Sequence, residues 1–195
     1  SFWFNATSLS HSDTSSQGGQ GLYSRDSSGY DSGGHLTIWL QPTGAIRVRH
    51  QNTNSNGEIN TDPLISVNNW HHLVYTWGSN GMRLYVDGVL SDTNLDFTSG
   101  TTGNSEPMIF GANAWQSGND ESTPANLKDF FKGQMDEIKF YSNQIDSSLV
   151  TELYGQSQYD CTQCDSDELV AQYQFEQDSW LGSNAVLDNS INTNH

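Results

Sequence analysis

Paired carboxylates are the side chains that glycoside hydrolysis needs, and two acidic pairs stand in this sequence, Asp120-Glu121 and Asp136-Glu137. That reaction requires an acid and a nucleophile about 5 Å apart on one surface. Adjacent residues of a strand point to opposite faces, so neither pair can supply both groups. No Glu-x-Asp-x-Glu pattern, which would align carboxylates on one face, occurs in the chain. The sequence therefore predicts a protein that is not an enzyme.

Thiol and imidazole groups offer a second kind of chemistry. Cys161 and Cys164 form a Cys-x-x-Cys motif, but a zinc site would need a second ligand pair and a redox site would need a βαβ context. We predict a small disulfide loop between the two cysteines, which implies an oxidising compartment. His71 and His72 are adjacent on a predicted strand, so they diverge, and we interpret them as structural.

Trp39, Arg47 and Arg49 are candidates for ligand binding. Leu36, Ile38 and Leu40 alternate with Trp39 and must face a core, which turns the tryptophan outward. The same alternation turns both arginines outward. An outward tryptophan could stack on a sugar ring, and the alternative is a cation–π pair with Arg47 or cover by a loop.

Several loop residues have the side-chain types that sugar recognition uses, although any polar rim has them too. This set contains Arg25, Asp26, Tyr30, Asp31, His35, Asn113, Trp115 and Asp120. From it, Arg25, Asp26, Tyr30 and Trp115 join Trp39, Arg47 and Arg49 as the predicted ligand-binding residues.

The elements that must position these residues are short strands. Residues 69–90, NWHHLVYTWGSNGMRLYVDGVL, alternate with period two around a Gly-Ser-Asn-Gly turn, which predicts a hairpin that pairs Leu73 with Val86. A second hairpin turns at Pro42-Thr43-Gly44 and pairs Trp39 with Arg47. One short helix is predicted over residues 147–155. Many short strands without βαβ alternation indicate an all-β sandwich or jelly roll.

Composition narrows the possible partners. The chain has 195 residues and a formal net charge of −16, from 23 acidic and 7 basic side chains. Such a surface disfavours nucleic acid and anionic membranes, and it is compatible with bound cations and secretion. No run of about 18 apolar residues occurs, so no membrane-spanning segment is predicted.

A resemblance to a known family rests on five segments in order over residues 1–154. They are SFWF, GLYSRDSSGYDSGGHLTIWL, WHHLVYTWGSNGMRLYVDG, GNSEPMIFGAN and FFKGQMDEIKFYSNQI. Together they resemble the laminin-G-like, concanavalin A-like lectin/glucanase superfamily, and most of all its bacterial branch in repeats of surface adhesins. A weaker likeness is to accessory proteins of type IV pili.

The resemblance implies an antiparallel jelly-roll β-sandwich at the cell surface or outside the cell. It implies a non-catalytic module that recognises carbohydrate or a glycoconjugate within a larger adhesin or pilus-associated protein. The alternative is a structural spacer repeat, or an accessory domain of a larger secreted enzyme, that binds no sugar.

The chain divides into a domain over residues 1–155, a linker over 156–168 that holds the two cysteines, and a tail over 169–195. The tail segments LVAQYQFE and LDNSINTNH resemble the beginning of the family's domain, and residues 1–155 lack its usual first strands. The tail is therefore the start of a second repeat or a permuted strand of the first. We predict that residues 169–176 fill a sheet position, in their own chain or in a neighbouring one.

Calcium is the predicted cofactor. Strict alternation in GQMDEIKFY puts Asp136 on the same face as Ile138, toward the core, where an unpaired carboxylate would be costly. Calcium with oxygen ligands would resolve that cost. By resemblance, the ligands would be Asp136 with Asp188, Asn192 and Asn194 of the loop over residues 188–194. The alternative is that Asp136 accepts main-chain hydrogen bonds at a turn.

Overall fold

The computed structural model describes residues 1–11, 18–25, 34–52, 55–101, 104, 107–113, 127–155, 169–174 and 187–188. The strands are β1 (Phe2–Ala6), β2 (Gln20–Arg25), β3 (His35–Leu40), β4 (Ile46–Gln51), β5 (Asn56–Asn60), β6 (Trp70–Thr76), β7 (Met82–Val86), β8 (Val89–Asn94), β9 (Ile109–Phe110), β10 (Gly133–Asp136), β11 (Ile138–Tyr141), β12 (Leu169–Gln174) and β13 (Leu187–Asp188). The helix is α1 (Ser147–Gly155), as the sequence predicts.

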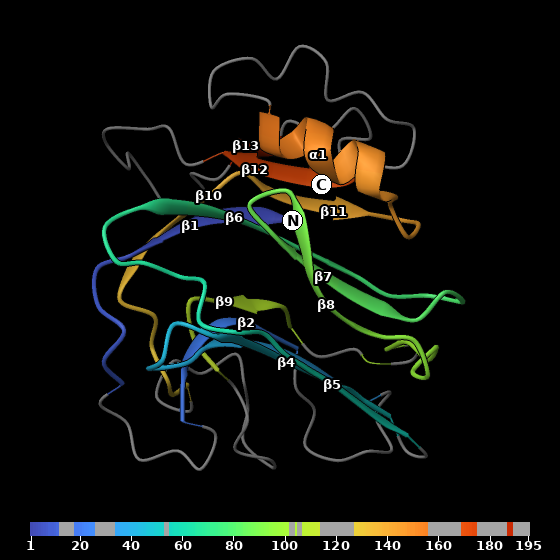
Figure 1. The fold of residues 1–195 in the computed structure, drawn as a ribbon, viewed down its shortest axis with the longest axis horizontal. Helices are drawn as coiled ribbons and strands as arrows, with labels where there is room; N and C mark the ends of the chain where they lie inside the picture. The colour runs from blue at the N-terminus through green and yellow to red at the C-terminus, as the bar shows by residue number, and fades with distance from the viewer. Residues whose placement is uncertain are drawn as a thin grey trace.

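Two five-stranded antiparallel sheets form a sandwich. The first sheet has the strand order β10-β1-β6-β7-β8 and the second has β5-β4-β3-β2-β9. Figure 1 shows the two sheets as stacked layers, with α1 above the first sheet and the second sheet at the bottom. The all-β jelly-roll sandwich predicted from the sequence is confirmed.

The core lies between the two sheets because both present their apolar alternate positions to it. Phe4, Leu73 and Leu84 of the first sheet are fully buried there, and so are Ile46 and Val48 of the second. Burying side chains of this size stabilises the fold by about 1.5–3 kcal/mol each relative to exposure.

Both predicted hairpins have the predicted register. Leu73 pairs with Val86 in the first sheet. In the second sheet, Leu40 pairs with Ile46 and Trp39 pairs with Arg47. Alternation alone predicted the register of both hairpins, because a slip of one residue would turn an entire set of apolar side chains toward solvent.

The last part of the sandwich is a strand broken in two. Glu137 has a φ of 51° and separates β10 from β11. Beyond the break, Ser1 and Lys139 exchange main-chain hydrogen bonds, which continue the pairing of the N-terminal segment with β11. On its other side β11 pairs with β12, and β12 pairs with β13. Residues 169–174 therefore occupy a sheet position in their own chain, one of the two predicted arrangements.

The helix α1 covers the outer face of the first sheet. It begins after Asp146, whose Oδ1 accepts the N–H of Leu149 at 2.9 Å, the usual N-cap contact. Val150 and Leu153 are buried against Val74 and Tyr85 of the sheet. Among the described residues no helix has the length and apolar character needed to cross a bilayer.

Candidate functional site

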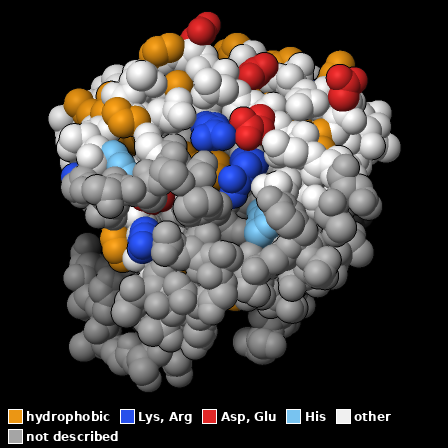
Figure 2. Space-filling view, turned by 90° about the horizontal axis from the view of Figure 1, so that it is seen from below, with side chains coloured by type: hydrophobic (Ala, Val, Ile, Leu, Met, Phe, Trp, Pro, Cys, Tyr) orange, Lys and Arg blue, Asp and Glu red, His pale blue; other side chains and the backbone are white. Residues whose placement is uncertain are grey.

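The candidate site is a group of five side chains on the outer face of the second sheet, which we call the outer-face cluster: Thr37, Trp39, Arg47, Arg49 and Glu58. Register places them in adjacent rows across the strands. One row is Ser24, Thr37, Arg49 and Glu58, and the next contains Gly21, Trp39, Arg47 and Asn60. Figure 2 shows this side of the molecule, where Lys or Arg side chains adjoin Asp or Glu side chains.

Trp39 lies on the outward face, as predicted, but its ring is not exposed. The core cluster contains Ile38 and not Trp39, yet the exposed fraction of Trp39 is 0%. The guanidinium carbons of Arg47 and Arg49 each lie 5.5 Å from the ring centroid. The ring is therefore not open for a sugar to stack on, and of the two alternatives the cation–π contact is the one found.

The cluster contains buried donors that the described residues do not satisfy. The Thr37 Oγ1 and the Trp39 Nε1 are both buried and have no hydrogen-bond partner among them. A buried polar group without a partner costs about 1–3 kcal/mol, so such groups call for a specific explanation. Beside them, an Arg47 Nη donates to Glu58 Oε1 at 3.1 Å, in a pair whose carboxylate side chain is 42% exposed.

His35 stands at the start of β3, beside the cluster. Burial, with a smaller contribution from the nearby positive charge of Arg49, lowers the pKa of His35 to about 4. The imidazole is therefore neutral at pH 7 and adds no charge to the positive end of the cluster.

Arg25 does not join the cluster. It pairs opposite Leu36, on the core side of the alternation, and an Arg25 Nη donates to the carbonyl of Asn104 at 2.6 Å. The Asn104 amide in turn donates to the carbonyls of Arg25 and Gly34. These contacts connect the end of β2 and the residue before β3 to Asn104.

Asn113 belongs to a buried polar chain rather than to a ligand site. Its amide donates to Asp129 Oδ2 at 3.0 Å and its Oδ1 accepts the Ser24 hydroxyl at 3.3 Å. Asp129 Oδ1 lies 2.7 Å from Nε2 of His11. This chain fixes the segment around Asp129 to the second sheet, and sequence reasoning missed it.

The other predicted ligand residues fall outside the described residues. They are Asp26, Tyr30, Asp31, Trp115 and Asp120, and the predicted disulfide of Cys161 and Cys164 falls outside as well. The structure thus brings Trp39, Arg47 and Arg49 together. It adds Thr37 and Glu58, which the sequence analysis missed as site residues. Glu58 could have been found by extending the strand register one hairpin further, through NGEIN.

An apolar cavity of about 200 Å³ lies between the sheets. Apolar side chains dominate its lining, among them Phe2, Tyr23, Ile38, Phe110 and Phe140. Sugars require dense hydrogen bonding to their hydroxyl groups, so this cavity is not the candidate site for carbohydrate.

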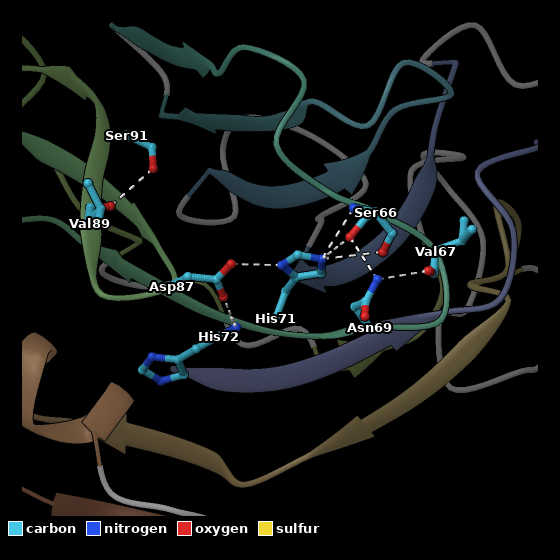
Figure 3. Close-up of polar contacts among 8 residues, drawn as sticks. All are labelled: Ser66, Val67, Asn69, His71, His72, Asp87, Val89 and Ser91. Carbon is cyan, nitrogen blue, oxygen red and sulfur yellow. Dashed lines mark hydrogen bonds and ion pairs between the residues drawn. The ribbon is translucent and has the colours of Figure 1, made fainter.

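Ser66, His71 and Asp87 make the contacts of a nucleophilic triad. Figure 3 shows His71 between the other two, with its Nδ1 2.8 Å from Asp87 Oδ2 and its Nε2 3.1 Å from Ser66 Oγ. The main-chain N–H of Ser66 also lies 3.2 Å from Nε2, and Asn69 donates to Ser66 Oγ. His71 Nε2 contacts both the main-chain N–H and the hydroxyl of Ser66 and so holds the loop that precedes β6. We therefore assign these contacts a structural role.

The electrostatics of that group agree with a stabilising role. The hydrogen bond with Asp87 raises the pKa of His71, although burial opposes it. Burial by itself would raise the pKa of Asp87, but hydrogen bonds from His71 and from the N–H of His72 hold it below its usual value. His72 points the other way and stacks on Trp3 at 5.0 Å. The prediction that the two histidines diverge is confirmed.

Asp136 does not face the core, so the prediction that strict alternation turns it toward the core was wrong. The left-handed backbone of Glu137 breaks the alternation, and Met135 rather than Asp136 packs against the core with Ile138. Asp136 pairs opposite Trp3 on the side of α1, and its Oδ1 accepts the N–H of Glu137 at 2.8 Å. The alternative in which Asp136 accepts a main-chain bond at a turn is therefore present.

The predicted calcium site now rests on the resemblance alone. Within the described residues, no group of three His, Cys, Asp or Glu side chains could hold a metal ion. Asp188 lies on β13, two strands from β11, and Asn192 and Asn194 fall outside the described residues. Asp136 by itself is not a site, so calcium stays a prediction.

Calcium removal tests that prediction. If Asp136 and the loop over residues 188–194 hold the ion, chelation should lower the melting temperature of the parent and leave that of Asp136→Asn unchanged. Differential scanning calorimetry with added calcium and with chelator measures both. An equal melting temperature of the parent in the two conditions would remove the site.

Comparison with solved structures identifies similar folds at 13–18% identity. A Bacteroides ovatus protein proposed to bind carbohydrate matches 96% of this chain at 13% identity and a TM-score of 0.62, and this chain spans 48% of that protein. The CBM40 of a Ruminococcus gnavus IT-sialidase matches 80% of each chain at 13% identity and a TM-score of 0.58.

A third similar structure is domain 4 of an extracellular GH43 arabinanase from Geobacillus stearothermophilus, solved with arabinotriose. It matches 78% of this chain and 64% of its own at 18% identity, with a TM-score of 0.55. Among curated protein sequences, none matches this chain. At these identities the likenesses establish the fold.

Family membership follows from the sequence match together with the sandwich. The sequence model of a family described as the Concanavalin A-like lectin/glucanases superfamily matches residues 1–150. This stretch contains both five-stranded sheets and the outer-face cluster. The chain belongs to the Concanavalin A-like lectin/glucanases superfamily.

Proposed function

We propose that this chain is a non-catalytic carbohydrate-binding module whose ligand engages the outer-face cluster. The observation that carries the proposal is the pair of rows across the second sheet, where two guanidinium groups lie over a buried tryptophan and one of them pairs with a partly exposed carboxylate. Guanidinium groups supply hydrogen-bond donors and a carboxylate supplies acceptors, and the hydroxyl groups of a sugar can bond to both. The similar structures described as carbohydrate-binding support the same assignment.

The setting we propose is extracellular, within a larger surface adhesin or pilus-associated protein. Its support is the family resemblance, the acidic composition and the similarity to a domain of an extracellular arabinanase. The carboxylates agree with a role without catalysis, because Glu137 forms a buried ion pair with Lys139 while Asp136 lies on the side of α1.

Replacing Arg49 is expected to weaken carbohydrate binding. A hydrogen bond to a charged group contributes about 1.5–3 kcal/mol, so Arg49→Ala should lose about tenfold or more in affinity. A glycan array, with and without calcium, selects a ligand, and titration calorimetry measures the change. Arg83→Ala is the matched control, because Arg83 lies on β7 of the other sheet. If the parent binds no glycan in either condition, the spacer alternative replaces the proposal.

A further inference from the structure

The apolar cavity between the sheets lies in line with β1, at the end where that strand begins. Ser1 and Phe2 close one end of the cavity, residues 73–77 line one side, and residues 138–145 line the other. Its floor includes Tyr23 and Phe110 of the second sheet. Figure 1 marks the N-terminus beside β6 and β11. The cavity therefore has the place of a strand between β6 and β11, and we call it the strand slot.

Main-chain groups of β6 face the strand slot. This strand pairs with β7 as far as Thr76, but its pairing with β1 ends at Leu73. Along an antiparallel strand the main-chain groups of successive residues point to alternate sides. The carbonyl of His72 accepts the N–H of Asp87 on the side of β7. The N–H and C=O of Tyr75 therefore face the slot, where no described strand pairs with them.

The opposite wall of the slot continues the same geometry. Ser1 and Lys139 exchange both of their main-chain hydrogen bonds, so β1 and β11 are in antiparallel register at this point. A strand that continued the line of β1 would place its nearest residue between Tyr75 and Phe140. Sheet edges of this kind are templates for the addition of an extended peptide.

Alternation also determines which side chains such a strand would need. Phe2 packs in the core, so Ser1 points to the opposite face and the next position in line points to the core again. That position lies over Phe110, whose ring centroid is 5.1 Å from that of Tyr23 and 5.9 Å from that of Phe140. An apolar side chain fits this aromatic floor.

The far end of the slot is accessible to a partner. Trp77, Ser142 and Asn143 line this end, and all three are exposed. The formal net charge of −16 favours a partner segment that carries basic residues outside the slot.

We infer that the strand slot binds an extended segment of a partner polypeptide, which adds to the first sheet in line with β1 and presents an apolar side chain to Tyr23, Phe110 and Phe140. This site is separate from the outer-face cluster, which lies on the outer face of the other sheet. The inference therefore goes beyond carbohydrate binding and does not depend on it.

Peptide binding tests the inference. The probe is acetyl-Lys-Thr-Val-Thr-Val-Thr-Lys-amide, and the control peptides carry asparagine in place of both valines or proline in place of the central threonine. Titration calorimetry should detect binding of the valine peptide and much weaker binding of both controls, because one lacks the apolar side chains and the other lacks a main-chain donor. Phe110→Ala should weaken binding about tenfold. Phe130→Ala is the matched control, because Phe130 is 52% exposed and does not line the slot.

Amide hydrogen exchange of the parent protein locates the bound peptide without any substitution. Exchange at Tyr75 should slow when the valine peptide is added, whereas exchange at Thr76, whose main-chain groups face β7, should not change. Equal slowing at both amides, equal binding of the three peptides, or an equal loss in Phe130→Ala would overturn the inference. If residues added before Ser1 raise the melting temperature while no peptide binds, the slot accepts a segment of its own chain and the partner is excluded.

Discussion

Lowering the pH from 7 to 5 is expected to destabilise the protein by about 4 kcal/mol through two buried histidines, His50 and His72. Burial lowers the pKa of His50 to about 4. Burial, with smaller contributions from the charges of the N-terminus and of Lys139, lowers the pKa of His72 to about 3. Their exposed fractions are 0% and 2%, so both imidazoles are neutral in the folded protein at pH 5.

The direction in which stability changes with pH depends on whether the folded or the unfolded chain binds more protons. Between the unfolded pKa near 6.5 and the folded values, the unfolded chain binds a proton at each histidine and the folded chain does not. Stability therefore falls as the pH falls through this window. Each group contributes on the order of 2 kcal/mol between pH 6.5 and 5. The buried Nδ1 of His72 has no acceptor among the described residues, so protonation there is not compensated.

His72→Phe isolates one of the two contributions. A phenyl ring can keep the stacking with Trp3 and Tyr154 but cannot titrate. Urea unfolding from pH 4.5 to 7 should show the slope of stability against pH reduced by about 1.4 kcal/mol per pH unit, the value for one proton. Parallel curves for the parent and the variant would contradict the assignment.

His71 provides a control, because its contribution to stability changes with pH in the opposite direction to that of His72. The hydrogen bond with Asp87 raises the pKa of His71. Its stabilising contribution is therefore complete below the unfolded pKa near 6.5 and is lost as the pH rises through the folded value. His71→Gln should steepen the fall of stability on acidification in the range above about pH 6.5, whereas His72→Phe should flatten it below that pH.

What the sequence could predict was the part of the fold that local alternation controls. The register of Trp39 opposite Arg47 followed from Leu40 and Ile46 needing the same core. The short helix over residues 147–155 was also predicted, and the structure adds Asp146 in the capping position. In each case the residues that decide the outcome lie within one hairpin or one helical turn of each other.

What it could not predict depended on backbone breaks and on distant partners. Alternation failed at Glu137 because a single left-handed residue shifts the parity of the strand, and Glu gives no signal of that conformation as Gly would. The face of Trp39 was predictable and a cation–π pair with Arg47 was one of the alternatives, but the second arginine over the ring, Arg49, was not predicted. The hydrogen bond between His11 and Asp129 joins residues 118 positions apart.

Replacing Lys139 by methionine is expected to destabilise the protein by about 3–5 kcal/mol. The Nζ of Lys139 lies 2.9 Å from Glu137 Oε2, and the side chains are only 7% and 8% exposed. Lys139→Met leaves a carboxylate buried without its countercharge, whereas the main-chain pairing of residue 139 with Ser1 is retained. Urea unfolding at pH 7 measures the loss.

Two comparisons make the result specific to the buried pair. Adding Glu137→Gln to Lys139→Met should recover most of the stability, because no uncompensated charge then remains. Glu58→Gln breaks the more exposed pair with Arg47 and should cost about 1 kcal/mol or less. Equal losses in Glu58→Gln and Lys139→Met would contradict the importance of burial.

The same substitution should also alter the response to acid. The charge of Lys139 helps to lower the pKa of His72, so Lys139→Met is expected to raise that pKa toward its usual value. The folded protein would then take up a proton at His72 at a higher pH, and stability would fall less steeply on acidification. Lys139→Met should thus be less stable at pH 7 and also less sensitive to acid, and a purely packing defect would produce only the first effect.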